Sequence, residues 1–148
     1  MAFTYKAGIA SVGQYQMSAI PYVTSSITAP KLGTAPLEIS FPRITNFVTI
    51  RNTVPSGSMP EHTLRVGFSS LGTSGSANFV YSTQNYLTLR NGESYTGEWR
   101  VSKIYLLGDT EIDGGALESS ASIIAGLTAI STSSAPSFRN WSGSLGIG

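Results

Sequence analysis

Short runs of alternating apolar and polar residues recur along most of the chain, and they constrain its fold more than any other feature. In the clearest run, Leu64, Val66 and Phe68 alternate with Arg65 and Gly67. Successive side chains of a β-strand point to opposite faces, so this pattern predicts a strand with one buried face. Similar runs occur at 38–41, 44–51, 78–82, 86–90, 99–107 and 123–130. The sequence therefore predicts an all-β protein.

The spacing of these runs predicts one domain made of two packed sheets. About eight strands, separated by connections rich in Gly, Pro, Ser and Asn and with no helical segment, are typical of a β-sandwich. Their alternating faces favour antiparallel pairing. We expect a single jelly roll, with an immunoglobulin-like sandwich as the second choice. The domain is expected to span residues 1–148, with a flexible N-terminal arm at 1–13 and a C-terminal tail at 131–148.

Four local signals predict how particular segments are placed. Pro21 interrupts a strand expected at 15–25, and proline lacks a ladder donor, so this strand is expected to lie at a sheet edge or to bend there. The Asn-Gly pair at 91–92 lies between two strand-like runs and predicts a hairpin. The apolar face switches near 102–103, which predicts a β-bulge. The β-branched segment 123–127, with a central Gly, favours a buried strand over a helix.

The composition excludes several classes of function. The chain contains no Cys, which excludes a disulfide scaffold, a thiolate metal site and a Cys nucleophile. Charged residues make up 11% of the chain, against about 25% in typical soluble domains. The net charge is +1 without a basic stripe, so the electrostatic footprint of a nucleic-acid-binding protein is missing. A polar but uncharged surface repels its neighbours weakly and favours self-association.

No targeting or membrane segment is expected. Residues 1–13 contain one Lys and no apolar core, which is unlike a signal peptide. No run approaches the roughly 18 consecutive apolar residues of a membrane-spanning helix. We therefore expect synthesis in the cytosol, no export by the N-terminal route and no membrane span.

The residues offer little for catalysis. The chain has one histidine, His62, and its many serines lack a G-x-S-x-G context. A zinc site would have to combine this single histidine with carboxylates alone, which is unusual. We interpret His62 as a solvated loop residue, and we expect no enzyme activity, no catalytic residues and no cofactor.

One acidic segment is a weak candidate for binding calcium. Asp109, Glu111 and Asp113 alternate and are followed by Gly, like the start of a calcium-binding loop. The closing bidentate Glu should fall at position 120, which is Ser120. The favoured interpretation is therefore a hydrated loop between two strands. The sequon at Asn140 is interpreted as a chance match, because no export signal accompanies it.

Aromatic residues predict packing or binding surfaces. They are either a sugar-stacking platform or, as is commoner at strand positions, core and interface residues. The set comprises Tyr22, Tyr81, Tyr86, Tyr95, Trp99, Tyr105 and Trp141. The Ser- and Gly-rich tail also carries Phe138, Trp141, Leu145 and Ile147. A disordered linker would have few aromatics, so we expect this tail to dock on its own sandwich or on a neighbouring subunit.

Several blocks of the sequence, in order, are similar to one family of viral proteins. The blocks are 12–24 (VGQYQMSAIPYVT), 39–45 (ISFPRIT), 64–68 (LRVGF), 103–106 (KIYL), 124–130 (IAGLTAI) and 142–147 (SGSLGI). Together they resemble the small penton, or vertex, capsid proteins of large icosahedral double-stranded DNA viruses. The family has no catalytic residues.

The resemblance implies a single jelly roll that forms homopentamers at the fivefold vertices of a virion. The implied partners are other copies of the chain and the neighbouring major and minor capsid proteins, with no nucleic acid. A closed ring repeats one heterologous interface by rotation, which suits a neutral polar surface. The alternative is a carbohydrate- or receptor-binding β-sandwich, such as a fibre tip or a lectin-like module.

Overall fold

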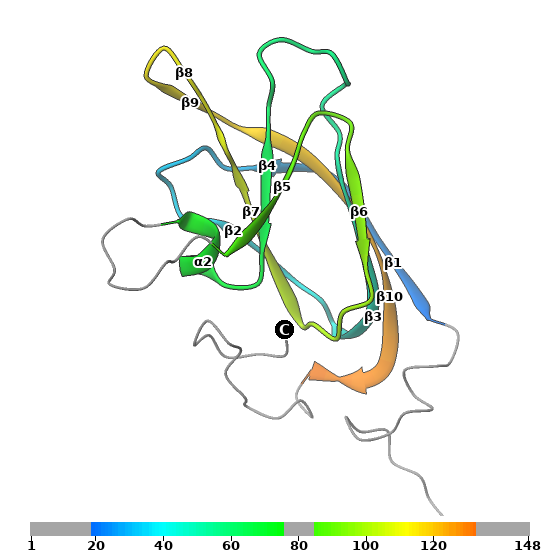
Figure 1. Ribbon diagram of the computed structural model, residues 1–148. Coiled ribbons are helices and arrows are strands. Elements are labelled where there is room, and N and C mark those ends of the chain that lie inside the picture. The colour runs from blue at the N-terminus through cyan, green and yellow to red at the C-terminus, as the bar shows by residue number, and fades with distance from the viewer. Residues whose placement is uncertain (1–18, 76–84, 133–148) are drawn as a thin grey trace, which may run out of the picture.

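The computed structural model describes residues 19–75 and 85–132, which form two four-stranded antiparallel sheets packed face to face (Figure 1). Sheet A contains, in spatial order, β1 (Ile20–Ala29), β10 (Ser119–Ser131), β3 (Arg43–Asn52) and β6 (Ser94–Gly97). Sheet B contains β2 (Leu37–Ser40), β7 (Lys103–Gly108), β4 (Leu64–Gly67) and β5 (Tyr86–Leu89). The predicted all-β sandwich is confirmed.

The pairing of these eight strands is nested, which is the topology of a jelly roll. The first strand pairs with the last (β1 with β10), the second with the seventh (β2 with β7), the third with the sixth (β3 with β6), and β4 with β5, all antiparallel. An immunoglobulin-like sandwich would instead pair several consecutive strands as hairpins. Among the eight strands described in sheets A and B, only β4 and β5 are consecutive strands that pair. The first-choice fold is therefore the one observed.

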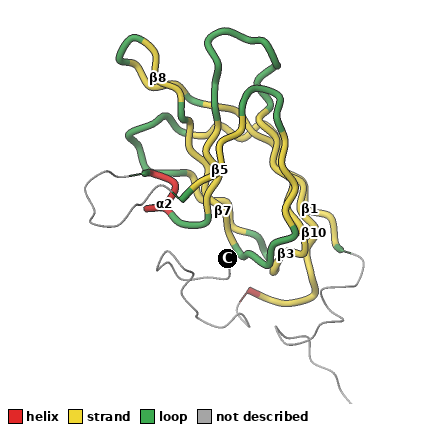
Figure 2. The backbone as a smooth tube through the Cα atoms, in the orientation of Figure 1, coloured by secondary structure: helices red, strands yellow, loops and turns green. Residues whose placement is uncertain are grey.

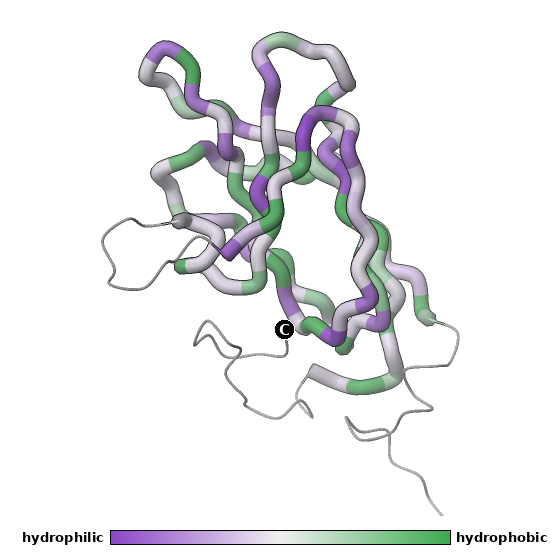
Figure 3. The backbone as a smooth tube through the Cα atoms, in the orientation of Figure 1, coloured by the Kyte–Doolittle hydropathy of each residue, from purple (hydrophilic) through white to green (hydrophobic). Residues whose placement is uncertain are grey.

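The core lies between the two sheets and follows the alternation of the sequence. The residues buried to 2% exposure or less include Val48, Ile50, Leu64, Val66, Ile104, Leu106, Ile123 and Ala125. Figure 3 shows hydrophobic and hydrophilic residues interspersed along the strands of both sheets. The predicted runs 38–41, 44–51, 64–68, 86–90 and 123–130 each overlap a strand. The run 78–82, the arm 1–13 and the tail beyond residue 132 lie outside the described residues.

The strand that carries Pro21 lies at an edge of sheet A, as predicted. β1 pairs with β10 on one side and is the first strand in the sheet order. Its register shifts between Thr24 and Ile27, where Ser26 has a φ of 57°. Such a bulge bends an edge strand and makes it a poor template for further pairing.

A short helix, α2 (Ser70–Ser74), covers part of the outer face of sheet B, where no helix was predicted (Figure 2). The Ser69 side chain caps its start by accepting a hydrogen bond from the Gly72 N–H at 3.0 Å. Gly75, with a φ of 64°, ends it in the left-handed conformation. Caps at both ends therefore define a helix that hydrophobic periodicity could not reveal in five residues. No helix in the described ranges is long and apolar enough to span a membrane.

Glycine at position 67 allows α2 to lie directly on the sheet. A Cβ at Gly67 would lie 2.1 Å from Oγ1 of Thr73. The Asn85 N–H donates to the Gly72 carbonyl at 3.0 Å, so the chain returns to α2 just before β5 begins. Arg65 and Gly67, expected on the exposed face of β4, are consequently buried.

The predicted Asn-Gly hairpin is wrong, although the turn itself forms. Gly92 has a φ of 76°, and the Glu93 N–H donates to the Arg90 carbonyl at 3.0 Å. The flanking strands do not pair, because β5 pairs with β4 in sheet B and β6 pairs with β3 in sheet A. The turn therefore carries the chain from one sheet to the other.

The predicted bulge near 102–103 is wrong, because the chain crosses from sheet A to sheet B there. The Thr45 N–H, on β3, donates to the Val101 carbonyl at 3.1 Å, whereas the Phe41 N–H, after β2, donates to the Ser102 carbonyl at 2.8 Å. β7 begins at the next residue and pairs with β2 without a register shift. Val101 and Ile104 both face the core because they lie on opposite sides of this crossing.

Substitution of Gly67 tests the packing of α2. Gly67→Ala places a methyl group against Thr73, so we expect a loss of about 1–3 kcal/mol in the free energy of unfolding. Urea denaturation measures the loss. Gly115→Ala is the matched control, since its Cβ would meet only the Ile112 carbonyl at 3.4 Å. Equal effects of the two substitutions would contradict this account.

Candidate functional site

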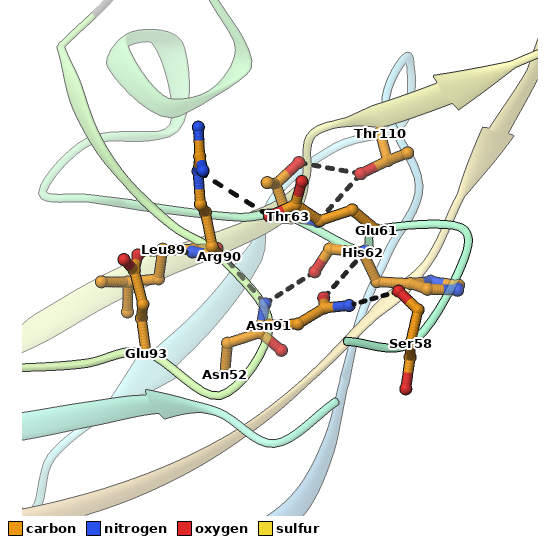
Figure 4. Close-up of polar contacts among 10 residues, drawn as sticks. All are labelled: Asn52, Ser58, Glu61, His62, Thr63, Leu89, Arg90, Asn91, Glu93 and Thr110. Carbon is orange, nitrogen blue, oxygen red and sulfur yellow. Dashed lines mark hydrogen bonds and ion pairs between the residues drawn. The ribbon is translucent and has the colours of Figure 1, made fainter. Parts of the chain in front are cut away.

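A buried amide organises the loops at one end of the sandwich (Figure 4). Asn52, at the end of β3, is fully buried. Its Nδ2 donates to the His62 carbonyl at 2.6 Å and to the Leu89 carbonyl at 3.2 Å, and its Oδ1 accepts from the Val54 N–H at 3.1 Å. Its backbone also bonds to residues 92 and 93 of the Asn-Gly turn. One residue thus joins β3, the 53–63 connection and the β5–β6 crossing.

His62 lies in a loop, as predicted, but it is half-buried and hydrogen-bonded into this network. Its N–H donates to Oδ1 of Asn91 at 2.9 Å, and its carbonyl accepts from the Ser119 hydroxyl at 3.0 Å. Its Nδ1 lies 2.6 Å from the Glu118 carbonyl. Because a carbonyl oxygen only accepts, Nδ1 must carry a hydrogen. His62 therefore ties the 53–63 connection to the start of β10.

A polar recess of about 340 Å³ opens beside this network. It is lined by Ser56, Gly57, Ser58, Met59, Glu61, Arg90, Asn91 and Glu93. Asn91 holds the lining together, since its Nδ2 donates to the Ser58 carbonyl at 3.2 Å. The Arg90 Nε lies 3.8 Å from Oε1 of Glu61, and both side chains are well exposed. The Arg90 cation thus faces the Glu61 carboxylate, and no hydrogen bond among the described residues of the recess pairs a nucleophile with a base.

The acidic segment forms a hairpin and not a calcium loop. Glu111 lies on β8 (Thr110–Ile112), which pairs with β9 (Gly115–Leu117) through a turn in which Asp113 has a φ of 50°. Asp109 bonds to Arg65, with Oδ1 2.6 Å from Nε. No three His, Cys, Asp or Glu residues in the described part of the chain are grouped to hold a metal ion. The expected hydrated loop is thus replaced by a hairpin, and the weak calcium candidate finds no grouped carboxylates among the described residues.

Arg65 secures α2 to the outer face of sheet B. Besides its ion pair with Asp109, its Nη1 donates to the carbonyls of Thr73 and Ser74 at 3.3 and 3.1 Å. Its guanidinium lies 4.2 Å from the centroid of the Tyr86 ring. Five donors in a planar fork allow one arginine to bind a carboxylate, two carbonyls and an aromatic face together.

An aromatic groove of about 350 Å³ lies between the β5 edge of sheet B and the β6 edge of sheet A. The groove is lined by Val66, Phe68, Asn85, Tyr86, Leu87, Tyr95 and Trp99. The Trp99 and Tyr95 rings stack with centroids 5.6 Å apart, and Phe68 meets Trp99 edge-on at 4.9 Å. Leu87 and Tyr95 remain 38% and 45% exposed. The groove is the largest gathering of aromatic residues that the structure describes.

Two other aromatic residues of the predicted platform, Tyr22 and Tyr105, lie elsewhere. Tyr22 packs edge-on against Phe41, at 5.3 Å between centroids. Tyr105 donates to Oε2 of Glu38 at 2.9 Å on the outer face of sheet B. Tyr81 and Trp141, like the Asn140 sequon, lie outside the described residues. Among the members of the set that the structure describes, only Tyr86, Tyr95 and Trp99 are therefore brought together.

The Glu38–Tyr105 contact shifts both groups. Partial burial, reinforced by the Glu38 carboxylate, raises the pKa of Tyr105 to about 12. Hydrogen bonds from Ser40 and Tyr105, with the nearby charge of Lys103, hold the pKa of Glu38 below its usual value. These groups are held in their ordinary ionisation states at neutral pH, which is typical of a surface network and not of an acid–base site.

The outer face of sheet A carries an exposed apolar pair. Val23 on β1 lies opposite Ile124 on β10, and the two are 67% and 48% exposed. On the adjacent strand, the Phe47 ring lies over Gly126, where a Cβ would approach within 2.4 Å. An apolar group on a face that is otherwise polar is a candidate contact surface.

Comparison of the chain with protein-family models, with curated proteins and with solved structures finds no match. The fold, the polar recess, the aromatic groove and the exposed apolar pair are therefore the structural basis for assigning a function.

Sequence analysis did not single out two residues that organise these surfaces, Asn52 and Arg65. Each left a weak signal. Asn52 follows a strongly apolar run directly before a Pro-rich connection, and Arg65 is a charge inside an otherwise apolar strand. Neither signal reveals a partner, because every bonded group lies far away in the sequence or on the backbone.

Replacing the Asn52 amide tests whether it holds the loops together. Asn52→Asp keeps the shape but replaces the donating NH₂ with an accepting oxygen, which leaves the His62 and Leu89 carbonyls without their donor. We expect a loss of about 2–4 kcal/mol in the free energy of unfolding. Asn46→Asp, a half-buried change of equal charge on the same strand, is the control for chemical denaturation. Similar losses for both variants would refute the role of Asn52.

Proposed function

We propose that this protein is a structural capsid protein, a penton that forms homopentamers at fivefold vertices of a virion and contacts the neighbouring major and minor capsid proteins. The observation that carries the proposal is the nested pairing of eight strands into a single jelly roll. Jelly rolls occur in viral capsid domains as well as in lectins and cupins, and the sequence blocks resemble penton proteins. Fold alone is an analogy, so both observations are needed.

The surface properties support a protein that acts through contacts. A closed fivefold ring joins one side of each copy to a different side of the next. The sandwich has two different lateral sides, one formed by the edge strands β1 and β2 and the other by β5 and β6. The exposed Val23 and Ile124 lie beside the first of these edges. The proposal assigns no catalytic residue, no cofactor and no nucleic-acid contact to the chain.

The mass of the protein in solution tests the ring. We expect light scattering to give five times the 15.6 kDa chain mass, or this assembly once a capsid partner is added. Val23→Lys should shift the population toward monomer, because it places a charge in the apolar contact. Ile112→Lys, an equally drastic change on the exposed β8, should leave the mass unchanged. A strict monomer under all these conditions would sink the proposal.

Carbohydrate binding is the second candidate function, and the aromatic groove is the observation that favours it. Tyr95 presents an exposed ring beside Trp99, and aromatic faces stack on sugars. A glycan array tests this function, with Tyr95→Ala as the control. If the protein is a penton, we expect it to bind no glycan on the array. A monomer whose glycan binding disappears in Tyr95→Ala would replace the capsid proposal with the binding-module one.

A further inference from the structure

The aromatic groove lies along two sheet edges beyond which the structure describes no further strand. β5 pairs with β4 and β6 with β3, and each is the last described strand of its sheet. Their outward backbone groups and the apolar floor of the groove are therefore exposed on the same side. An exposed edge beside apolar surface is usually covered in native proteins, because it otherwise favours association with other chains.

The chain leaves the sandwich at the same end as the Trp99 side of this groove. Thr45, on β3, lies opposite Leu127 near the end of β10, and its hydroxyl donates to the Trp99 carbonyl at 2.6 Å. Farther along, Nη1 of Arg43 donates to the Ala129 carbonyl at 3.0 Å. Figure 1 shows the last part of β10 bending at the end where β6 stops and β7 begins. The start of the tail is thus held near the groove by β3.

The tail has the length and the residues to fill the groove. An extended chain advances about 3.3 Å per residue, so Phe138 can lie up to about 20 Å from residue 132 and Trp141 up to about 30 Å. These distances exceed the length of β6, which has four residues. Phe138 and Trp141 are apolar side chains in a segment otherwise rich in Ser and Gly. Their burial against Tyr95, Leu87 and Trp99 would remove apolar surface from water on both sides.

We propose that residues 133–148 dock on the β5–β6 side of their own sandwich and insert the Phe138 and Trp141 side chains into the aromatic groove. The same chain is the occupant because a short connection gives its tail a high effective concentration at the groove, which a neighbour's tail lacks. This inference does not rest on the capsid function, since a monomer can make the contact.

Disulfide trapping tests the proposal directly, because the chain has no native cysteine. Leu87→Cys in the groove is combined with Ser137→Cys, Asn140→Cys or Ser142→Cys. These tail positions flank Phe138 and Trp141. We expect at least one pair to form an intramolecular disulfide under mild oxidation, seen on a non-reducing gel and by mass spectrometry. The matched control is Val23→Cys with the same partners, on the far side of the sandwich, and it should remain reduced. Equal trapping of both sets, or disulfide-linked dimers from the groove pairs alone, would overturn the proposal.

Hydrogen exchange supplies a second readout that needs no new cysteine. In the Phe138→Ser/Trp141→Ser variant, the amides of β5 and β6 should exchange at least roughly fivefold faster, because local protection is lost without global unfolding. The amides of β2, an edge strand on the other side, should not change. Ser142→Ala is the tail control. Unchanged exchange in β5 and β6 would overturn the proposal even if the variant folds normally.

Discussion

The structure depends on hydrogen bonds to the backbone N–H and C=O groups wherever the chain crosses from one sheet to the other. Nested pairing sends nearly every connection across the sandwich, and each crossing removes backbone groups from a ladder. Two buried polar side chains at opposite ends of β3 meet this need. Asn52 bonds the carbonyls of residues 62 and 89 at one end, and the Thr45 hydroxyl serves the 99–101 crossing at the other, where it also accepts from the Val101 N–H at 3.1 Å. β3, an inner strand of sheet A, therefore fixes both ends of the sandwich, and with them the recess and the groove.

The sequence predicted which segments form strands but not how they pair. Alternation fixes the buried face of a strand, as Leu64 and Val66 show, yet it carries no information on the partner strand. The Asn-Gly turn formed as expected, but its two strands entered different sheets, because each already paired with another strand. Helix α2 was missed because five residues are too few for periodicity to appear, and its stability comes from the caps, Arg65 and the close approach at Gly67.

The sequence shows which residues are aromatic but not which of them meet. Only the fold separates Tyr95 and Trp99, which meet in the groove, from Tyr22, which packs on Phe41. The acidic triplet looked like a ligand set because spacing along the chain does not reveal that a hairpin keeps the carboxylates apart. Asp109 pairs with Arg65 of β4, a strand distant in the sequence. Such an ion pair depends on the register between strands, which residue spacing does not reveal.

The return of the chain to α2 before β5 has a consequence for how this protein can change over evolution. The Asn85 N–H is bonded to the Gly72 carbonyl, so both anchors of the intervening segment meet at one place on the outer face of sheet B. The entropy of closing a loop rises only slowly with its length. Residues inserted between the two anchors would therefore leave the register of β4 and β5 unchanged. Lineages can diversify this outer surface by lengthening one segment while the eight-strand scaffold stays constant.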